Sequence, residues 1–453
     1  MGNKLFVKVY NVGFGDCVYV RIPDNDTDFH MLVDCGTKEA AEPMLKDAID
    51  HFKTQLPDDP ETVATPNPKK CLDLLVVTHP HADHIKGFDP AWFKDIKIKY
   101  IWLSAFMKKD HPQANTAHAL LDLSNRTALS LLDRRLSLSS DLKAYLMNSI
   151  WNPGAMDALR GEGSEEKRLD PDAARAYVSR DIATNLSTNE PESLKFSFQE
   201  GTTCFKGFNE EGTLIRILAP EWNIDKYYSG EGSSTEDVHS LTDVNIEVQR
   251  EKSTGEERKT IPYPRNICDL DFQILRHRLF YSAMTFSQDD ADLKNNTSVV
   301  FLLEWRGHRL LFTGDAEWHG EDVEEGEKNG CWDVMLKKDE QFGHLAKPLS
   351  YLKVSHHGSI NGTPFNAEEG AEQPILDNLL PKDQKAQIVL STDWKKYRKK
   401  NKVPNPGLLK EFGKRTASRH KYPDDPDIPN VWQPVRTDLE NKHIETIFEK
   451  EPD

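Results

Sequence analysis

The chain has 453 residues, enough for two or three domains of average size, and a formal net charge of −16. This acidic balance disfavours binding to DNA or to an anionic membrane through bulk electrostatics, although a local basic groove is compatible with it. No apolar run reaches the roughly 18 to 20 residues that a membrane-spanning helix needs, and the N-terminus lacks a signal-peptide core. We therefore expect a soluble, cytoplasmic protein with no membrane partner.

Short strand-like runs alternate with turns in the first part of the chain. The run at 71–79, CLDLLVVTH, is apolar on both faces, as expected for the centre of a covered sheet. Apolar and β-branched residues also predict strands over 5–12, 17–22, 30–36 and 98–106, with a helix over 38–52. The six cysteines lie far apart without a Cys-x-x-Cys pair, which favours reduced thiols over disulfides or a zinc ribbon.

The middle of the chain departs from this alternation, and strand patterns return after it. Leucines at three- and four-residue spacing predict two helices over 118–150, whereas 221–266 is polar, turn-rich and typical of a loop insertion. Further strands are predicted over 212–220, 297–305, 308–317, 349–359 and 386–393.

Four of the predicted strands end in polar residues, namely Asp34, His79, Asp315 and His356. In layered α/β structures, functional sites are commonly built at strand ends, where a rigid sheet positions side chains that loops leave accessible. We therefore expect these four residues to belong to one site.

The densest polar motif is HPHADH at 79–84, directly after an apolar strand. His79 and His81 can point the same way, while Asp83 and His84 point into an adjacent space. Imidazole suits zinc, iron and manganese, and a carboxylate adds charge neutralisation, so the motif is compatible with two neighbouring metal ions. Such ions lower the pKa of a bound water to about 7 and act as Lewis acids.

THPHADH resembles the HxHxDH signature of the metallo-β-lactamase fold superfamily, an αββα sandwich found in hydrolases and nucleases. MLVDCG, LLFTGDAE and LKVSHHGS follow in the superfamily's order. More narrowly, NVGFGDC, NNTSVVFLLEWRGHRLLFTGDAE and VSHHGS together resemble the metallohydrolase domain of ComEC-type competence proteins, a branch associated with DNA processing.

The resemblance implies an α/β fold of the αββα type that is interrupted by helical and loop insertions. The predicted segments are a first half of this domain over 1–104, a largely helical insertion over 105–210, a strand with a polar loop insertion over 211–290, a second half over 291–395, and a basic segment with the C-terminal tail over 396–453.

The resemblance also implies one or two divalent metal ions, Zn²⁺ or Mn²⁺, held by His79, His81, Asp83, His84, Asp315 and His356. The first two histidines would hold one metal, Asp83 and His84 the other, and Asp315 would bridge them. His356 would complete the second site. Asp83, or a hydroxide held between the metals, would assist the nucleophile. His357 would contact a ligand, a leaving group or phosphate, or have only a packing role.

Other polar residues near these motifs have several alternative roles. Many superfamily members have a metal-binding histidine where this chain has Asn295 or Asn296, and an amide oxygen is a weaker ligand than imidazole, so the metal's identity and number stay open. Asp16 would approach the metals, hydrogen-bond a ligand histidine or be a simple turn residue. Asp34 is expected to orient the HxHxDH loop rather than bind metal.

A basic run follows the last predicted strand, in the segment DWKKYRKKNK at 393–402. Trp394 and Tyr397 within it are candidates for stacking on bases, and the run as a whole is either a substrate site or a solvated face. The cations that we expect to contact an anionic substrate are Lys395, Lys396, Arg398 and Lys399.

The sequence therefore favours a metal-dependent phosphodiesterase or nuclease, in which a metal-activated hydroxide attacks phosphorus in DNA, RNA or a nucleotide. A second hypothesis keeps the metals but hydrolyses a carboxylic ester, lactone or thioester in an apolar pocket. A third is a non-enzymatic interaction protein. In each case the leucine-rich helical insertion is a candidate surface for a protein partner or a homodimer.

Overall fold

The computed structural model describes residues 4–25, 27–38, 42–114, 118, 153–180, 208, 212–224, 227, 293–320, 323, 329–340, 343–368, 370–397, 403–421, 432–439 and 442–449. The two helices expected over 118–150, with their candidate partner surface, and the polar loop expected over 221–266 lie almost entirely outside the described residues. Within the described part of the chain, no helix combines the length and the apolar character needed to cross a lipid bilayer.

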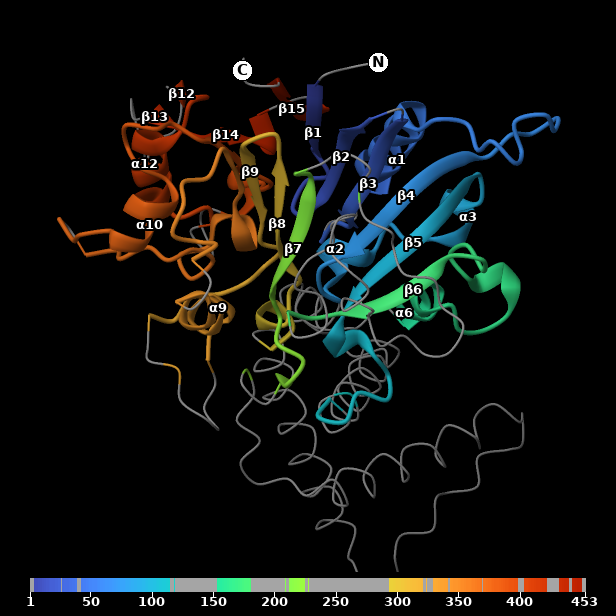
Figure 1. Ribbon diagram of the computed structural model, residues 1–453, viewed down its shortest axis with the longest axis horizontal. Helices are drawn as coiled ribbons and strands as arrows, with labels where there is room; N and C mark the ends of the chain where they lie inside the picture. Colours follow the sequence, from blue (N-terminus) through green and yellow to red (C-terminus); the bar gives the residue numbers. More distant parts are fainter. Residues whose placement is uncertain are drawn as a thin grey trace, which may run out of the picture.

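The first sheet has seven strands in the order β15-β1-β2-β3-β4-β5-β6 (Figure 1). The pairings from β15 to β3 are antiparallel, and those from β3 to β6 are parallel. The strands are β1 (Lys4–Tyr10), β2 (Cys17–Asp24), β3 (Thr27–Cys35), β4 (Lys70–Val77), β5 (Ile96–Ser104), β6 (Ala174–Val178) and β15 (His443–Glu449).

The second sheet has six strands in the order β14-β11-β10-β9-β8-β7. The pairings from β7 to β9 are antiparallel, and those from β9 to β14 are parallel. The strands are β7 (Leu214–Ala219), β8 (Val300–Trp305), β9 (His308–Phe312), β10 (Tyr351–Lys353), β11 (Gln387–Leu390) and β14 (Val435–Arg436). A separate small hairpin joins β12 (His420–Lys421) and β13 (Trp432–Gln433).

Helices of different lengths connect these strands. The α-helices are α1 (Glu42–Gln55), α2 (Ala82–Ile85), α3 (Pro90–Phe93), α6 (Pro153–Arg160), α9 (Cys331–Asp339), α10 (Pro374–Leu379), α11 (Trp394–Tyr397) and α12 (Pro406–Arg415). Four 3₁₀ turns are described, η1 (Ala105–Met107), η2 (Glu165–Lys167), η5 (Ser355–Gly358) and η6 (Thr437–Leu439).

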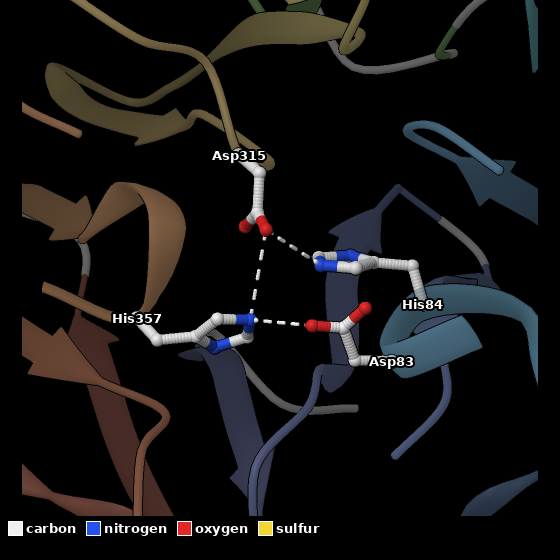
Figure 2. Close-up of side chains that lie close together, drawn as sticks. All are labelled: Asp83, His84, Asp315 and His357. Carbon is white, nitrogen blue, oxygen red and sulfur yellow. Dashed lines mark hydrogen bonds and ion pairs between the residues drawn. The ribbon is translucent and has the colours of Figure 1, made fainter. Parts of the chain in front are cut away.

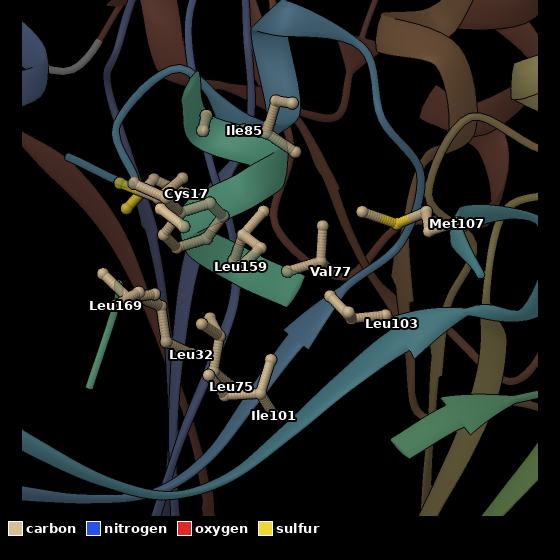
Figure 3. Packing of buried hydrophobic residues seen from close by; sticks show 14 of the residues in the cluster. Cys17, Leu32, Leu75, Val77, Ile85, Ile101, Leu103, Met107, Leu159 and Leu169 are labelled. Carbon is tan, nitrogen blue, oxygen red and sulfur yellow. The ribbon is translucent and has the colours of Figure 1, made fainter. Parts of the chain in front are cut away.

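Strand β4 shows why the first sheet is covered on both faces. Leu74 and Val76 belong to a buried cluster that contains residues of both sheets, including Phe301 and Leu303 of β8. The alternate residues, such as Leu75, belong to a second cluster on the opposite face, which also contains residues of α1 and α6 (Figure 3). Successive strand residues point to opposite faces, so one strand supplies both cores.

The outer face of the second sheet has its own cluster. Leu352 of β10 and Ile388 of β11 pack there with Leu376 of α10 and with Leu408 and Phe412 of α12. Figure 1 shows α10 and α12 beyond the second sheet, on the side away from the first. The two sheets thus share one apolar interior, and helices cover the outer faces.

The structure confirms the mixed α/β class and the predicted strands over 5–12, 17–22, 30–36 and 71–79 to within a few residues at their ends. The strands predicted from 212 onward correspond to β7, β8, β9, β10 and β11. The described cysteines are free and buried.

The two edge strands of the first sheet were not predicted from the sequence. β6 lies within 105–210, the segment expected to be largely helical, and extends the first sheet beside β5. β15 lies within the C-terminal segment 396–453 and pairs with β1 over its whole length. The segments outside the two halves of the expected domain therefore also contribute to its sheets.

Leu303→Ala tests the shared core. Leu303 is fully buried between the sheets, so its truncation lowers the free energy of unfolding by about 2 to 5 kcal/mol. The control is Val63→Ala, at a side chain that is 54% exposed, which changes that free energy by less than about 0.5 kcal/mol. Urea unfolding followed by tryptophan fluorescence measures both, and equal shifts would contradict the placement of Leu303.

Candidate metal centre

The polar residues of both sheets meet where their parallel strands end. His79 follows β4, Asp83 and His84 lie on α2, which comes next in the chain, Asp315 follows β9, and His357 lies in the η5 turn after β10. Figure 2 shows Asp83, His84, Asp315 and His357 pointing toward one another from these elements. Segments that are more than 200 residues apart in the sequence therefore build one site.

One group of four side chains is fully buried. His357 Nε2 lies 3.1 Å from Asp83 Oδ2 and 3.6 Å from Asp315 Oδ2. His84 Nε2 lies 3.3 Å from the same Asp315 oxygen. Each of the four residues offers one ligand atom, and these atoms all lie within 4.8 Å of one another, so the group could hold a metal ion.

A second group shares Asp315 with the first. His79 Nε2 lies 3.8 Å from Asp315 Oδ2 and 3.0 Å from His81 Nδ1. The ligand atoms of His79, His81 and Asp315 also lie within 4.8 Å of one another. The structure thus brings together five of the six expected metal ligands, with Asp315 common to both groups.

The donor atoms fit a cation because several of them lack another partner. Asp83 Oδ1, both carboxylate oxygens of Asp315 and His84 Nε2 are buried and accept or donate no hydrogen bond within the described structure. Buried polar atoms are nearly always hydrogen-bonded, and the exceptions call for an explanation. A divalent cation among these oxygen and nitrogen atoms would satisfy all three residues.

The sixth expected ligand, His356, lies outside both groups. His356 and His357 have φ angles of 44° and 53°, in the left-handed region that non-glycine residues rarely adopt, and Gly358 after them has a φ of 84°. This backbone turns the two neighbouring imidazoles apart. His357 enters the buried group, whereas His356 Nδ1 lies 3.2 Å from Glu317 Oε1.

Glu317 and the two asparagines form a polar cluster around His356. Asn295 Nδ2 donates to Glu317 Oε1 at 2.8 Å. Asn296 Oδ1 accepts from the backbone N–H groups of Glu317 and Cys331, so this side chain fixes the loop after β9. Burial acts to raise the pKa of Glu317, but hydrogen bonds from His319 and His356 outweigh it and lower that pKa to about 2. The asparagines thus contact the carboxylate that holds His356.

Asp34 contacts the ligand loop through three donors. Its carboxylate accepts from the backbone N–H of Thr78 at 2.7 Å and from the Thr78 hydroxyl at 2.6 Å, and lies 2.7 Å from His84 Nδ1. A carboxylate on the second nitrogen of a metal-binding imidazole fixes the ring's orientation. Asp34 therefore orients His84 so that Nε2 faces Asp315.

Asp16 joins the two sheets beside the site. Its backbone N–H donates to the carbonyl of Asp83 at 2.9 Å, and its carboxylate pairs with the buried ammonium of Lys353 at 2.8 Å and accepts from the Ser391 hydroxyl. Burial acts to raise the pKa of Asp16, but Lys353 outweighs it and the pKa is lowered. These partners make Asp16 a connector between β2 and the ends of β10 and β11.

The charge states of two aspartates and two histidines in the site suit cation binding. Burial acts to raise the pKa values of Asp83 and Asp315, but nearby cationic and imidazole groups, Lys38 and His84 foremost, hold them well below the usual range. Burial, together with neighbouring cationic groups, keeps the pKa values of His79 and His81 well below the usual range. Ionised carboxylates and neutral imidazoles are the forms that coordinate metals.

The basic run is only partly described. Lys395 and Lys396 are exposed on α11, whereas Arg398 and Lys399 lie outside the described residues. Trp394 is 4% exposed and is therefore buried rather than available to stack on a base. Aromatic contacts connect α11 to the site. The ring centre of Tyr397 lies 4.1 Å from that of Phe14, and the ring centre of Phe14 lies 4.2 Å from that of His357.

No sequence pattern identified Lys38, Lys353, Glu317 or Phe14 as part of the site. Two weak signals were present. A lysine inside an otherwise apolar strand, as at Lys353, requires a buried counter-charge, and an acid two residues after Asp315 points to the same side of an extended segment. Neither signal identifies the partner, because each partner lies far away in the sequence.

Comparison with models of known protein families and with curated proteins finds no significant match to this chain.

Asp34→Asn tests the orientation of His84. The amide is a weaker acceptor for the imidazole N–H, so we expect the affinity for Zn²⁺ to fall about 10- to 100-fold without a change in stoichiometry. The matched control is Asp73→Asn, because Asp73 also accepts a backbone N–H, that of His30, but lies away from the site. Isothermal titration calorimetry measures the Zn²⁺ affinity of both variants. Equal affinities would contradict the role of Asp34 in orienting His84.

The Asp16–Lys353 pair gives a prediction for stability. Lys353→Met leaves a buried carboxylate unpaired and lowers the free energy of unfolding by about 3 to 5 kcal/mol, and adding Asp16→Asn recovers part of it. The folded-state pKa of Asp16 is lowered, so its contribution is complete above the unfolded-state pKa of about 3.9 and is lost as pH falls below it. Urea midpoints from pH 7 to pH 3 should show wild type and Asp16→Asn converging at the acid end. A constant difference would contradict an ionised Asp16.

Proposed function

We propose that the chain is a metal-dependent hydrolase of the metallo-β-lactamase fold that acts as a phosphodiesterase or nuclease on DNA, RNA or a nucleotide. The observation that carries the proposal is the position of Asp315. Its carboxylate belongs to both buried ligand groups, lies 3.3 to 3.8 Å from three of their histidines and has no hydrogen-bond partner outside those groups in the described structure, as suits a residue that would contact two cations.

The architecture supports the fold that the motifs resemble. Residues of both sheets share one apolar cluster, and helices lie over the two outer faces, which is the layer order of an αββα sandwich. Each motif of the resemblance also falls at a strand end that reaches the site. We propose that fold on the combination of layers and strand-end ligands, since either alone occurs in other α/β proteins.

The residues divide into two proposed metal sites. His79, His81 and Asp315 would hold one ion, and Asp83, His84, Asp315 and His357 the other. Mixed imidazole and carboxylate donors suit Zn²⁺ or Mn²⁺. Bound there, these ions would supply Lewis acidity and lower the pKa of a coordinated water.

The chain's own residues position this chemistry. Asp34 orients His84, and His357 Nδ1, 3.0 Å from the Ser391 carbonyl, is fixed so that Nε2 faces the two aspartates. His356 is 22% exposed and held by Glu317, so this imidazole borders the buried group from the solvent side. We propose that His356 contacts the substrate, and that His357 is the ligand at the position which the sequence pattern gave to His356.

The surroundings favour an anionic substrate over a neutral ester. Exposed Lys395 and Lys396 lie on α11, and the ring contacts of Tyr397 with Phe14 and of Phe14 with His357 place that helix beside the ligands. Cations near a phosphoryl group stabilise the charge that develops during transfer. This arrangement supports phosphate esters rather than lactones or thioesters.

Metal content and hydrolysis of bis(p-nitrophenyl) phosphate test the proposal together. We expect purified wild-type protein to bind one or two divalent ions and to hydrolyse the diester with Zn²⁺ or Mn²⁺, and expect activity to be lost on chelation. Asp315→Asn should lower kcat by about 100-fold or more and reduce the metal content, because Asp315 serves both groups. His420→Ala, at an exposed position on β12, is the control and should change neither.

The other outcomes separate the alternatives. Bound metal with cleavage of p-nitrophenyl acetate but not of the phosphodiester would favour an ester, lactone or thioester hydrolase. Bound metal with no cleavage of either would favour a non-enzymatic role. Protein that binds no divalent metal in any of these conditions would contradict the proposed function altogether.

A further inference from the structure

Lys38 is a partly exposed cation that contacts one of the buried ligands. It follows β3 by three residues, and its Nζ lies 2.9 Å from Asp83 Oδ2. The side chain of Lys38 is 25% exposed, whereas that of Asp83 is fully buried. The ammonium therefore stands between the proposed metal ligands and the solvent.

The position of Lys38 is fixed by the backbone around it. Its backbone N–H donates to the Phe14 carbonyl at 2.8 Å, and its ammonium lies 5.0 Å from the centre of the Phe14 ring. At Gly36, a Cβ atom would come within 2.4 Å of the Asp83 carbonyl carbon and the His84 nitrogen, so this segment packs directly against α2. Lys38 thus has a defined location rather than that of a free surface lysine.

Lys38 would weaken metal binding if its only role were to pair with Asp83. An ammonium that pairs with a ligand carboxylate competes with a metal for its negative charge, and Asp83 Oδ2 also has His357 Nε2 at 3.1 Å. An ammonium has three N–H donors, of which Asp83 Oδ2 uses one. With a metal ion held by Asp83, the Lys38 ammonium would be available to an anionic oxygen placed over the site.

We infer that Lys38 binds a non-bridging phosphate oxygen of the substrate, and that this contact selects phosphate esters over neutral esters. The inference rests on the proposed function, because it names the substrate class of the same site. Lysine suits the role as a compact point charge that contacts phosphate without a fixed bidentate geometry.

Binding of inorganic phosphate to the metal-loaded full-length chain tests the inference without requiring turnover. Calorimetry should give a dissociation constant that is about tenfold higher or more for Lys38→Met than for wild type, because a charge-assisted hydrogen bond is lost. Lys38→Arg should recover part of the affinity. The metal content of Lys38→Met should equal that of wild type, and its metal affinity should be equal or higher, since a competing cation is removed.

The matched control is Lys99→Met. Lys99 pairs with Asp73 at 2.7 Å, so this variant also breaks a lysine–aspartate pair but lies on β5, away from the ligands. Its phosphate affinity should equal that of wild type.

Three results would overturn the inference: equal phosphate affinity for wild type and Lys38→Met, loss of metal from Lys38→Met, or no phosphate binding by metal-loaded wild type. Turnover of bis(p-nitrophenyl) phosphate separates this failure from failure of the proposed function. Wild-type turnover whose KM is unchanged by Lys38→Met would overturn the inference alone. Lysine-dependent phosphate binding without any turnover would support the anion site and count against the phosphodiesterase proposal.

Discussion

Two buried carboxylates, Asp83 and Asp315, set the central constraint on this structure. One follows a strand of the first sheet and the other a strand of the second, and neither is exposed. An ionised carboxylate in an apolar interior is strongly unfavourable unless cations or hydrogen-bond donors compensate it. Compensation here comes from Lys38, His84 and His357, which lie on three separate segments. The electrostatics of the site therefore joins the ends of both sheets, and the Asp16–Lys353 pair reinforces that junction from the side.

The η5 turn gives its two histidines, His356 and His357, different positions at this site. The left-handed backbone at His356 and His357 directs the two consecutive imidazoles to different partners. One enters the buried group of four and the other contacts Glu317, which Asn295 and Asn296 hold. Backbone strain of this kind persists only where the surrounding structure compensates it, and it is concentrated at functional sites. A single turn thereby provides both a proposed ligand and a proposed substrate contact.

The sequence predicted what is local and missed what depends on distant partners. Strand β4 could be predicted from its apolar run, and the HPHADH motif from its dense run of ligand residues, because each signal lies within a few positions. The position of His357 in the buried group depends on backbone angles that the residue types do not predict. The roles of Lys38 and Lys353 depend on Asp83 and Asp16, which lie on segments distant in the sequence. β15 alternates apolar and polar residues, but its pairing with β1 joins the two ends of the chain and has no local signal.

The most direct test of the account is anomalous diffraction from crystals grown with Mn²⁺ or Zn²⁺. We predict one or two peaks beside Asp315, one within coordination distance of Asp83, His84 and His357 and the other beside His79 and His81, with none between His356 and Glu317. A crystal structure with no peak at Asp315 in saturating metal, or with the metal held by His356 and Glu317 instead, would contradict the central claim.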